Sequence, residues 1–191
     1  MQLKPLALKL LFTLAFAGFA AGSAQAQLVA NGGFETGDTT GWNVQLGFFG
    51  LANVTSTSHS GAYALFFGNQ DSGVDNILQS IATTPGSQYQ LSFWAAASGG
   101  QAWAYVDGRQ VLSLPSNASS YTLYAVNFTA SSTSTQLKFG SAAGGYLSGG
   151  GYFLDDVTVT AVPEPSQWAL MGLGLAAMGA LVRRQRAAVT R

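Results

Sequence analysis

Residues 88–114 read QYQLSFWAAASGGQAWAYVDGRQVLSL, and this stretch decides the fold class. From Gln88 to Ala96 apolar residues recur at every second position, the pattern of a strand with one buried face. Asp107 and Gly108 then separate two further apolar segments, and both residues tolerate the positive φ of a two-residue hairpin turn. The stretch therefore predicts three strands, the last two of which form a hairpin.

Similar short segments occur on both sides of this stretch. Turn signals such as Asn31-Gly-Gly33 and Pro85-Gly86 separate them, and few Glu, Lys or Leu residues favour helices. Further strands are expected at residues 42–46, 62–67, 76–81, 121–130, 135–139 and 152–160. Many short strands separated in this way predict an all-β sandwich.

The first 26 residues have the composition of a secretory signal peptide. Lys4 and Lys9 flank the start of an apolar segment that runs to Ala21, and Ala24 and Ala26 supply the small residues of a signal-peptidase site. Signal peptidase and the Sec machinery are therefore expected partners, and we expect the mature chain to begin at residue 27. A retained N-terminal helix is the alternative, but the apolar core is short for one.

The last thirty residues, 162–191, have three parts. Pro163, Glu164 and Pro165 form a stiff spacer, because proline fixes its own φ and restricts the residue before it. An uncharged apolar run follows at residues 168–182, and its helix would reach about 23 Å, short of a hydrocarbon core of roughly 30 Å. The charges that prefer the cytoplasmic side of a membrane come last, at Arg183, Arg184 and Arg186. Such a marginal transmembrane helix suits a temporary anchor.

This tail resembles the PEP-CTERM sorting signal of Gram-negative bacteria that produce exopolysaccharide. The resemblance implies that an integral-membrane exosortase recognises the tail, removes it and passes the protein outward. It also implies export across the inner membrane, transient anchoring with the C-terminus cytoplasmic, and then a place on the cell surface or outside the cell. An ordinary C-terminal membrane anchor is the alternative.

Between these ends lies one domain of about 135 residues, 27–161, with an acidic balance. Its cations are Arg109 and Lys138. Its acids are Glu35, Asp38, Asp71, Asp75, Asp107, Asp155 and Asp156, which leaves a net charge of −5. A domain with this balance has no counterion-release route to nucleic acid, so we expect no nucleic-acid partner. The chain has no cysteine, which excludes disulfides, thiol catalysis and cysteine-based zinc sites.

Several short motifs occur in a characteristic order along the domain. They are Asn31-Gly-Gly-Phe-Glu35, Ser58-His-Ser-Gly61, the segment from Pro85 to Phe93, and Phe153-Leu-Asp-Asp-Val157. In this order they resemble the galactose-binding-like jelly rolls found among carbohydrate-binding modules. The resemblance implies a jelly-roll β-sandwich whose first and last strands meet.

In those modules a structural calcium often lies where the first and last strands meet. Carried over, the resemblance implies calcium ligands from Gly33, through its backbone, and from Glu35, Ser58, Gly61 and Asp155. Calcium takes six to eight hard oxygen ligands. Side chains alternate along a strand, so Asp155 is expected on the same face as the apolar residues Phe153 and Val157. A carboxylate that faces inward in this way needs a partner. The alternative is that Glu35 caps a turn and that Asp155 and Asp156 face solvent.

Sugar binding requires aromatic platforms on one sheet face, with amides and hydroxyls for the ring oxygens. The candidate platforms are Trp42, Trp94, Trp103, Tyr105 and Tyr124. Trp94 lies opposite the strand face of Leu91 and Phe93, so one of these two sets must be core. Core packing is the alternative role for each aromatic residue.

The residues available do not favour an enzyme. A glycoside hydrolase needs two carboxylates flanking a cleft, and Asp155 and Asp156 are neighbours that an extended strand would direct to opposite faces. His59 is the only histidine, and no Gly-x-Ser-x-Gly elbow accompanies it. We therefore expect a non-enzymatic surface or matrix protein associated with exopolysaccharide or biofilm. The alternatives are a lectin-like carbohydrate-binding module and, third, a secreted glycoside-active enzyme.

Overall fold

The computed structural model describes residues 27–47, 50–69, 73–97, 99–142, 151–163, 171–181 and 183. The predicted signal peptide, with Ala24 and Ala26, lies outside the described residues. So do Glu164, Pro165, Arg184 and Arg186 of the sorting tail.

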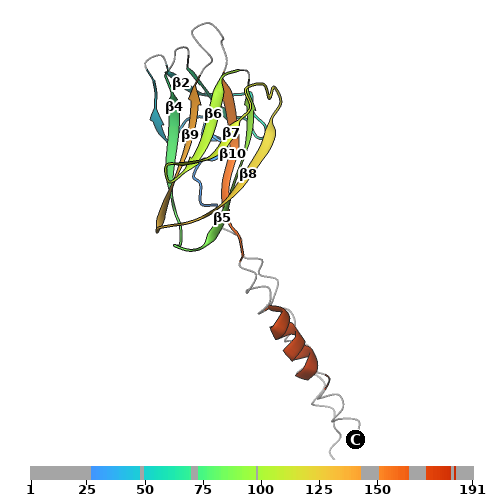
Figure 1. Ribbon diagram of the computed structural model, residues 1–191. Coiled ribbons are helices and arrows are strands. Elements are labelled where there is room, and N and C mark those ends of the chain that lie inside the picture. Colours follow the sequence, from blue (N-terminus) through green and yellow to red (C-terminus); the bar gives the residue numbers. More distant parts are fainter. Residues whose placement is uncertain are drawn as a thin grey trace, which may run out of the picture.

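Two antiparallel five-stranded sheets pack face to face (Figure 1). The first has the order β1-β4-β9-β6-β7 and the second the order β2-β3-β10-β5-β8. The strands are β1 (Asn43–Gln45), β2 (Gly50–Thr55), β3 (Ala64–Asn69), β4 (Asp75–Ala82), β5 (Gln88–Ala97), β6 (Gln101–Val106), β7 (Arg109–Leu114), β8 (Thr122–Thr129), β9 (Ser134–Ala142) and β10 (Tyr152–Ala161). This jelly-roll arrangement confirms the fold class that the sequence predicts.

The expected strands are all present, with ends that differ by no more than three residues. The hairpin turn is also confirmed, because Asp107 and Gly108 have φ values of 48° and 76°. Strand β2 was not predicted. It is an edge strand paired only with β3, and the buried carboxylate of Asp75 accepts hydrogen bonds from the N–H groups of Gly47 and Leu51 at 2.8 and 3.0 Å. These contacts join residues that are far apart in the sequence, so no local sequence pattern predicts the strand.

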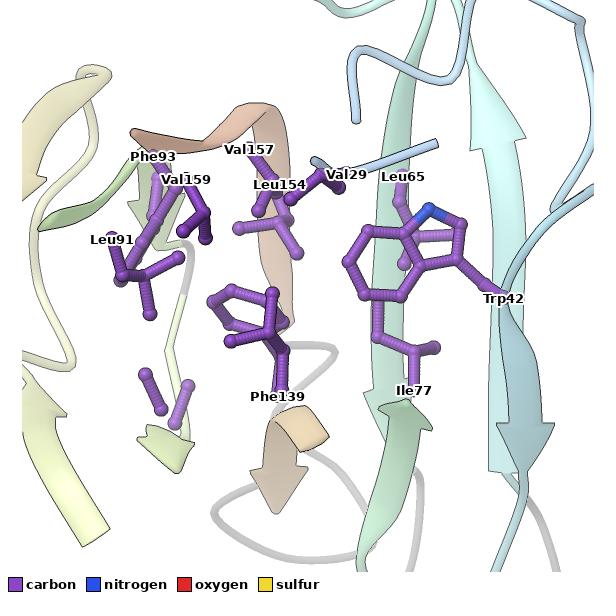
Figure 2. Packing of buried hydrophobic residues seen from close by; sticks show 14 of the residues in the cluster. Val29, Trp42, Leu65, Ile77, Leu91, Phe93, Phe139, Leu154, Val157 and Val159 are labelled. Carbon is purple, nitrogen blue, oxygen red and sulfur yellow. The ribbon is translucent and has the colours of Figure 1, made fainter. Parts of the chain in front are cut away.

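Large apolar side chains from both sheets interdigitate in the core (Figure 2). Leu91 and Phe93 of β5 face Phe139 of β9, and the rings of Phe93 and Phe139 meet edge to face at 5.0 Å. Trp42 is buried in the same cluster, and its indole N–H donates to the carbonyl oxygen of Asn31 at 3.1 Å. The alternation that the sequence shows in β5 therefore does mark its core face.

Strand β10 contains a bulge between Asp155 and Thr158, where Asp156 has a φ of 50°. The bulge changes which residues face inward. Leu154 is buried before it and Val157 after it, whereas Phe153 lies on the outer face against Phe66 at 5.0 Å. Phe153 and Asp155 therefore share the outer face, as expected, but Val157 does not share it, because the extra residue after Asp155 breaks the period of two.

Residues 171–181 form a helix whose large apolar side chains are exposed. These are Met171, Leu173, Leu175, Met178 and Leu181. Within the described part of the chain, no helix reaches the length and hydropathy required of a membrane span.

Candidate functional site

The outer face of the first sheet carries a row of polar and aromatic side chains, which we call the amide face. The buried residues Ile77, Phe139 and Ala104 alternate with outward residues on β4, β9 and β6. Register then places the following outward residues on one surface: Asn43, Gln45, Asn76, Leu78, Ser80, Gln101, Trp103, Tyr105, Gln110, Ser113, Gln136, Lys138 and Gly140. Six of these side chains carry amides, and none of these described residues is acidic.

Trp103 and Tyr105 lie two residues apart on β6, so both point away from the core. Trp103 pairs with Gly140 on one side and Ser113 on the other, and neither neighbour is bulky. A Cβ at position 140 would lie 2.9 Å from Asn76 Oδ1 and 3.7 Å from Trp103 Cε3. Glycine at this position therefore leaves room for the indole beside the amide of Asn76.

A hollow of about 350 Å³ lies at the β1 end of the amide face. Its lining residues are Gly41, Asn43, Gln45, Leu78, Gln79, Ser80 and Gln136. Gln79 forms one wall, and it holds the N-terminal segment by accepting from Ala30 N at 2.7 Å and donating to the carbonyl oxygens of Ala30 and Gly41 at 2.9 Å. The volume falls within the roughly 300–1,000 Å³ of small-molecule sites.

Lys138 lies between the hollow and the aromatic pair. Its cross-strand neighbours are Leu78 on β4 and Tyr105 on β6, and its Nζ lies 4.0 Å from the centroid of the Tyr105 ring. The one ion pair among the described residues joins His59 and Asp156, so Lys138 pairs with no described carboxylate. A cation held over an aromatic ring thus stands at the centre of the amide face.

The outer face of the second sheet also carries a tryptophan, but a loop covers it. The imidazole of His59 stacks on the indole of Trp94 at 3.7 Å with an interplanar angle of 13°. Tyr121 meets His59 edge to face at 5.6 Å and donates its hydroxyl hydrogen to the carbonyl oxygen of Thr57 at 2.7 Å. Trp94 therefore already has a stacking partner from its own chain.

Carboxylates hold this covering loop, residues 57–62, in place. Asp155 is fully buried, and its Oδ2 accepts from the N–H groups of His59 and Ser60 at 2.8 and 3.1 Å. Asp156 accepts from Ser60 Oγ and contacts His59 Nδ1, both at 2.8 Å. The bulge therefore brings the two carboxylates to the same loop, and the expectation that they point to opposite faces is wrong.

Burial and charge shift the acid–base properties of this network. Burial raises the pKa of Asp155 above its ordinary value, while the N–H donors of Ser60 and His59 oppose the shift. Burial also raises the pKa of Tyr121, and the nearby charges of Asp155 and Asp156 act in the same direction. The Tyr121 hydroxyl therefore stays a hydrogen-bond donor at neutral pH.

The residues that the resemblance implies as calcium ligands do lie near one another. Glu35 accepts from the N–H groups of Ala62 and Tyr63 at 3.0 Å, and Ser58 Oγ donates to the Gly61 carbonyl oxygen at 3.3 Å. A Cβ on Gly33 would lie 3.7 Å from Asp155 Oδ1. However, the oxygens of Glu35 and Asp155 accept hydrogen bonds from N–H groups, and the described residues contain no group of three or more acidic or histidine side chains that could hold a metal ion. Because these carboxylates are committed to N–H donors, the donor set does not fit a calcium cage, and the calcium that the resemblance implies stays an untested expectation.

The remaining predicted platforms do not lie on an open face. Trp42 is buried, stacking on Phe34 at 5.8 Å, so its assignment as a surface platform is wrong. Tyr124 of β8 packs against the core, where it stacks on Phe93 at 5.6 Å, and burial raises its pKa. Of the five candidates, only Trp103 and Tyr105 share a surface that no described loop covers, and the Lys138 ammonium group lies over the Tyr105 ring.

Sequence reasoning did not identify Asn43, Gln45, Gln136 and Lys138 as site residues. Each occupies an outward position in a strand, so alternation could have found their orientation. The sheet order that brings β1, β9 and β6 together was needed to group them.

A larger hollow, of about 840 Å³, lies along the open edge of the sandwich between β7 and β8. Arg109, Asn127 and Phe128 are among its lining residues. Its aromatic wall belongs to the core, because Phe128 stacks on Tyr89 at 5.6 Å. Without an outward aromatic surface, this hollow is a weaker candidate for sugar binding than the amide face.

The two-sheet fold and the family match define a β-sandwich module of the carbohydrate-binding class. Residues 26–141 match the family described as "Carbohydrate binding domain", and residues 161–186 match the PEP-CTERM protein-sorting motif. The chain belongs to the carbohydrate-binding domain family and carries a PEP-CTERM sorting motif at its C-terminal end. It is therefore an exosortase-sorted protein that is exported and processed at a membrane. A comparison with curated protein sequences found no match.

Solved structures share the fold at low sequence identity. The enzymatically active domain of tailspike protein 4 from bacteriophage CBA120 has a TM-score of 0.60 and 16% identity, with 71% of this chain and 21% of that chain covered. TmCBM61, solved in complex with β-1,4-galactotriose, has a TM-score of 0.59 and 19% identity, with 71% of this chain and 99% of that chain covered. The CBM22-1 xylan-binding domain of Paenibacillus barcinonensis Xyn10C has a TM-score of 0.54 and 14% identity, with 73% of this chain and 97% of that chain covered. This chain thus covers about a fifth of the tailspike chain and nearly all of the two modules.

Proposed function

We propose that the amide face binds a polysaccharide chain outside the cell. The observation that carries this proposal is that Trp103 and Tyr105 share one surface, which no described loop covers, with six amide side chains and a hollow. Aromatic rings offer an apolar surface to the C–H face of a sugar, and amides hydrogen-bond its hydroxyl groups. The surface combines both kinds of contact.

The width of the amide face supports a polymeric ligand. From β6 through β9 and β4 to β1 there are three strand spacings, or about 14 Å. The aromatic pair lies on β6, and the hollow lies beside β1. A ligand that contacts both must extend across the sheet, as an oligosaccharide does and a monosaccharide does not.

The structural relatives support binding to a glycan without identifying it. TmCBM61 was solved with a galactotriose, and the Xyn10C module is described as xylan-binding. At 19% and 14% identity these ligands do not transfer to this chain. We propose only the shared chemical class, a polysaccharide.

We propose that the protein acts by binding and not by catalysis. Asp155 and Asp156 hold the loop of residues 57–62, so they are not directed at an open cleft. None of the described residues that form the amide face carries a carboxylate. The acid and base pair of a glycoside hydrolase therefore has no counterpart there.

The sorting motif supports a location for this activity. We propose that exosortase releases the protein to the cell surface or the extracellular matrix, where it associates with exopolysaccharide or biofilm. The tail would be held briefly in the inner membrane with its arginines on the cytoplasmic side. The exposed apolar side chains of the helix at 171–181 supply a surface for that insertion.

Affinity electrophoresis of the full-length chain in neutral detergent against a polysaccharide panel tests the binding proposal. We expect at least one polysaccharide to retard the chain. Trp103→Ala should reduce the binding free energy by about 2 kcal/mol, which is roughly a 30-fold rise in Kd. Trp94→Ala is the matched control, because it removes a tryptophan from the covered face and leaves the amide face intact. Retardation that survives Trp103→Ala and disappears with Trp94→Ala would place the site on the other sheet.

A further inference from the structure

Lys138 is the sole cation among the described residues of the amide face. It lies on the central strand β9, between the hollow and the aromatic pair, with Nζ 4.0 Å from the Tyr105 ring centroid. Arg109, the other cation of the domain, lies in the edge hollow between β7 and β8. The amide face therefore presents one positive charge at its centre.

The acidic side chains that the structure describes are engaged elsewhere. Glu35, Asp155 and Asp156 are engaged with the loop of residues 57–62, and Asp75 is buried with its carboxylate bonded to Gly47 and Leu51. Asp107 is engaged in the β6–β7 hairpin, where it accepts from the N–H group of Gln136 at 2.8 Å. A domain with a net charge of −5 thus keeps one sheet surface free of described acidic side chains.

We propose that the amide face selects an acidic polysaccharide, and that Lys138 pairs with the carboxylate of a uronic acid residue. This inference rests on the proposed function of the same face. An ammonium group offers three donors, and its hydrogen bonds to a carboxylate are about twice as strong as neutral ones. A sugar ring stacked on Trp103 lies next to Tyr105 and the Nζ held over it, so a substituent on that sugar ring meets the cation.

The surroundings of Lys138 favour a carboxylate over a neutral hydroxyl group. The contact with Tyr105 holds the ammonium group over the sheet, which reduces the conformational entropy lost on binding. The outward neighbours that register gives it are Leu78, Tyr105, Gln136 and Gly140, and these uncharged residues do not compensate its charge. If Lys138 only covered Tyr105 with its aliphatic stem, the face would not discriminate by ligand charge.

The test compares acidic polymers with their neutral counterparts of the same backbone. We would titrate the full-length chain in neutral detergent with polygalacturonate and alginate, and with the same polymers after reduction of their carboxyl groups to alcohols. We expect at least one acidic polymer to bind about tenfold more tightly than its reduced form at low salt, and the difference to shrink as salt screens the charge. Equal affinity for both forms would overturn the inference and leave the proposed function intact.

Variants assign the selectivity to one residue. We expect Lys138→Met to weaken binding to the acidic polymer about tenfold more than binding to the reduced polymer, so that the preference for the acidic form is lost. Lys138→Arg should retain the preference, and Arg109→Met, the matched control outside the face, should have no effect. A preference that survives Lys138→Met would also overturn the inference. If the wild-type chain binds neither form of either polymer, the inference fails. The polysaccharide panel and Trp103→Ala test the proposed function separately, so its failure can be told apart from failure of this inference.

Discussion

The two outer faces of the sandwich each carry a half-buried tryptophan, but a described loop covers one of them and not the other. Trp103 on β6 lies beside Gly140 and among neutral amides, with no described loop stacked on it. Trp94 on β5 lies under the imidazole of His59 at 3.7 Å. Alternation along a strand thus identifies an outward aromatic residue, but a covering segment decides whether a sugar can reach it.

The same contrast separates the roles of the acidic residues. On the second sheet Asp155, Asp156 and Glu35 hold the covering loop through its N–H groups and side chains. On the first sheet the amide face has no acidic described residue. In the structure, these carboxylates accept hydrogen bonds that hold the loop of residues 57–62.

The largest effect should come from removing the buried carboxylate of the covered face. Asp155→Ala leaves the N–H groups of His59 and Ser60 without their acceptor, so we expect the free energy of unfolding to fall by about 3 kcal/mol. Chemical denaturation of the full-length chain measures this. Asp156→Ala, at a partly exposed position, should cost only about 1 kcal/mol. Equal losses at the two positions would show that burial does not distinguish them.

The next effect concerns the open face. Gly140→Val would place side-chain atoms against Asn76 and Trp103, and we expect the displaced indole to weaken polysaccharide binding about tenfold, or 1.4 kcal/mol. Affinity electrophoresis measures the change, and far-ultraviolet circular dichroism checks that the sheets are intact. Gly172→Ala, at a helical position with open space around it, is a control whose binding should be unchanged. Unchanged binding by Gly140→Val would mean that the indole is not part of the site.

A smaller effect is expected when the cover over Trp94 is removed. His59→Ala deletes the stacking contact and the hydrogen bond to Asp156, so we expect a loss of about 1 kcal/mol in stability. Acrylamide should then quench tryptophan fluorescence more strongly, while polysaccharide binding stays as in the wild-type chain. A loss of binding in this variant would move the site to the second sheet.

The smallest effect is expected from calcium. Because Glu35 and Asp155 already accept hydrogen bonds from N–H groups, we expect the melting temperature to differ by less than about 2 °C between excess calcium and excess chelator. Differential scanning fluorimetry measures it. A larger calcium-dependent rise that Glu35→Gln abolishes would instead support the ligand set that the family resemblance implies.

The sequence predicted the fold better than the site, for a physical reason. Strand periodicity and the Asp107-Gly108 turn are local, so the strands and the hairpin could be placed without the structure. The bulge at Asp156, the burial of Trp42 and the cover over Trp94 depend on contacts between distant segments. The amide face likewise exists only because sheet order brings β1, β4, β9 and β6 side by side.

The central claim is that the open face of the first sheet, through Trp103, contacts the polysaccharide. The chain has four tryptophans, so its ¹H–¹⁵N spectrum contains four indole signals, which Trp→Phe variants assign. On titration with a polysaccharide that retards the chain in affinity electrophoresis, we expect the Trp103 indole signal to shift. The signals of Trp42 and Trp94 should stay in place. A shift of the Trp94 signal with no change at Trp103 would contradict the account.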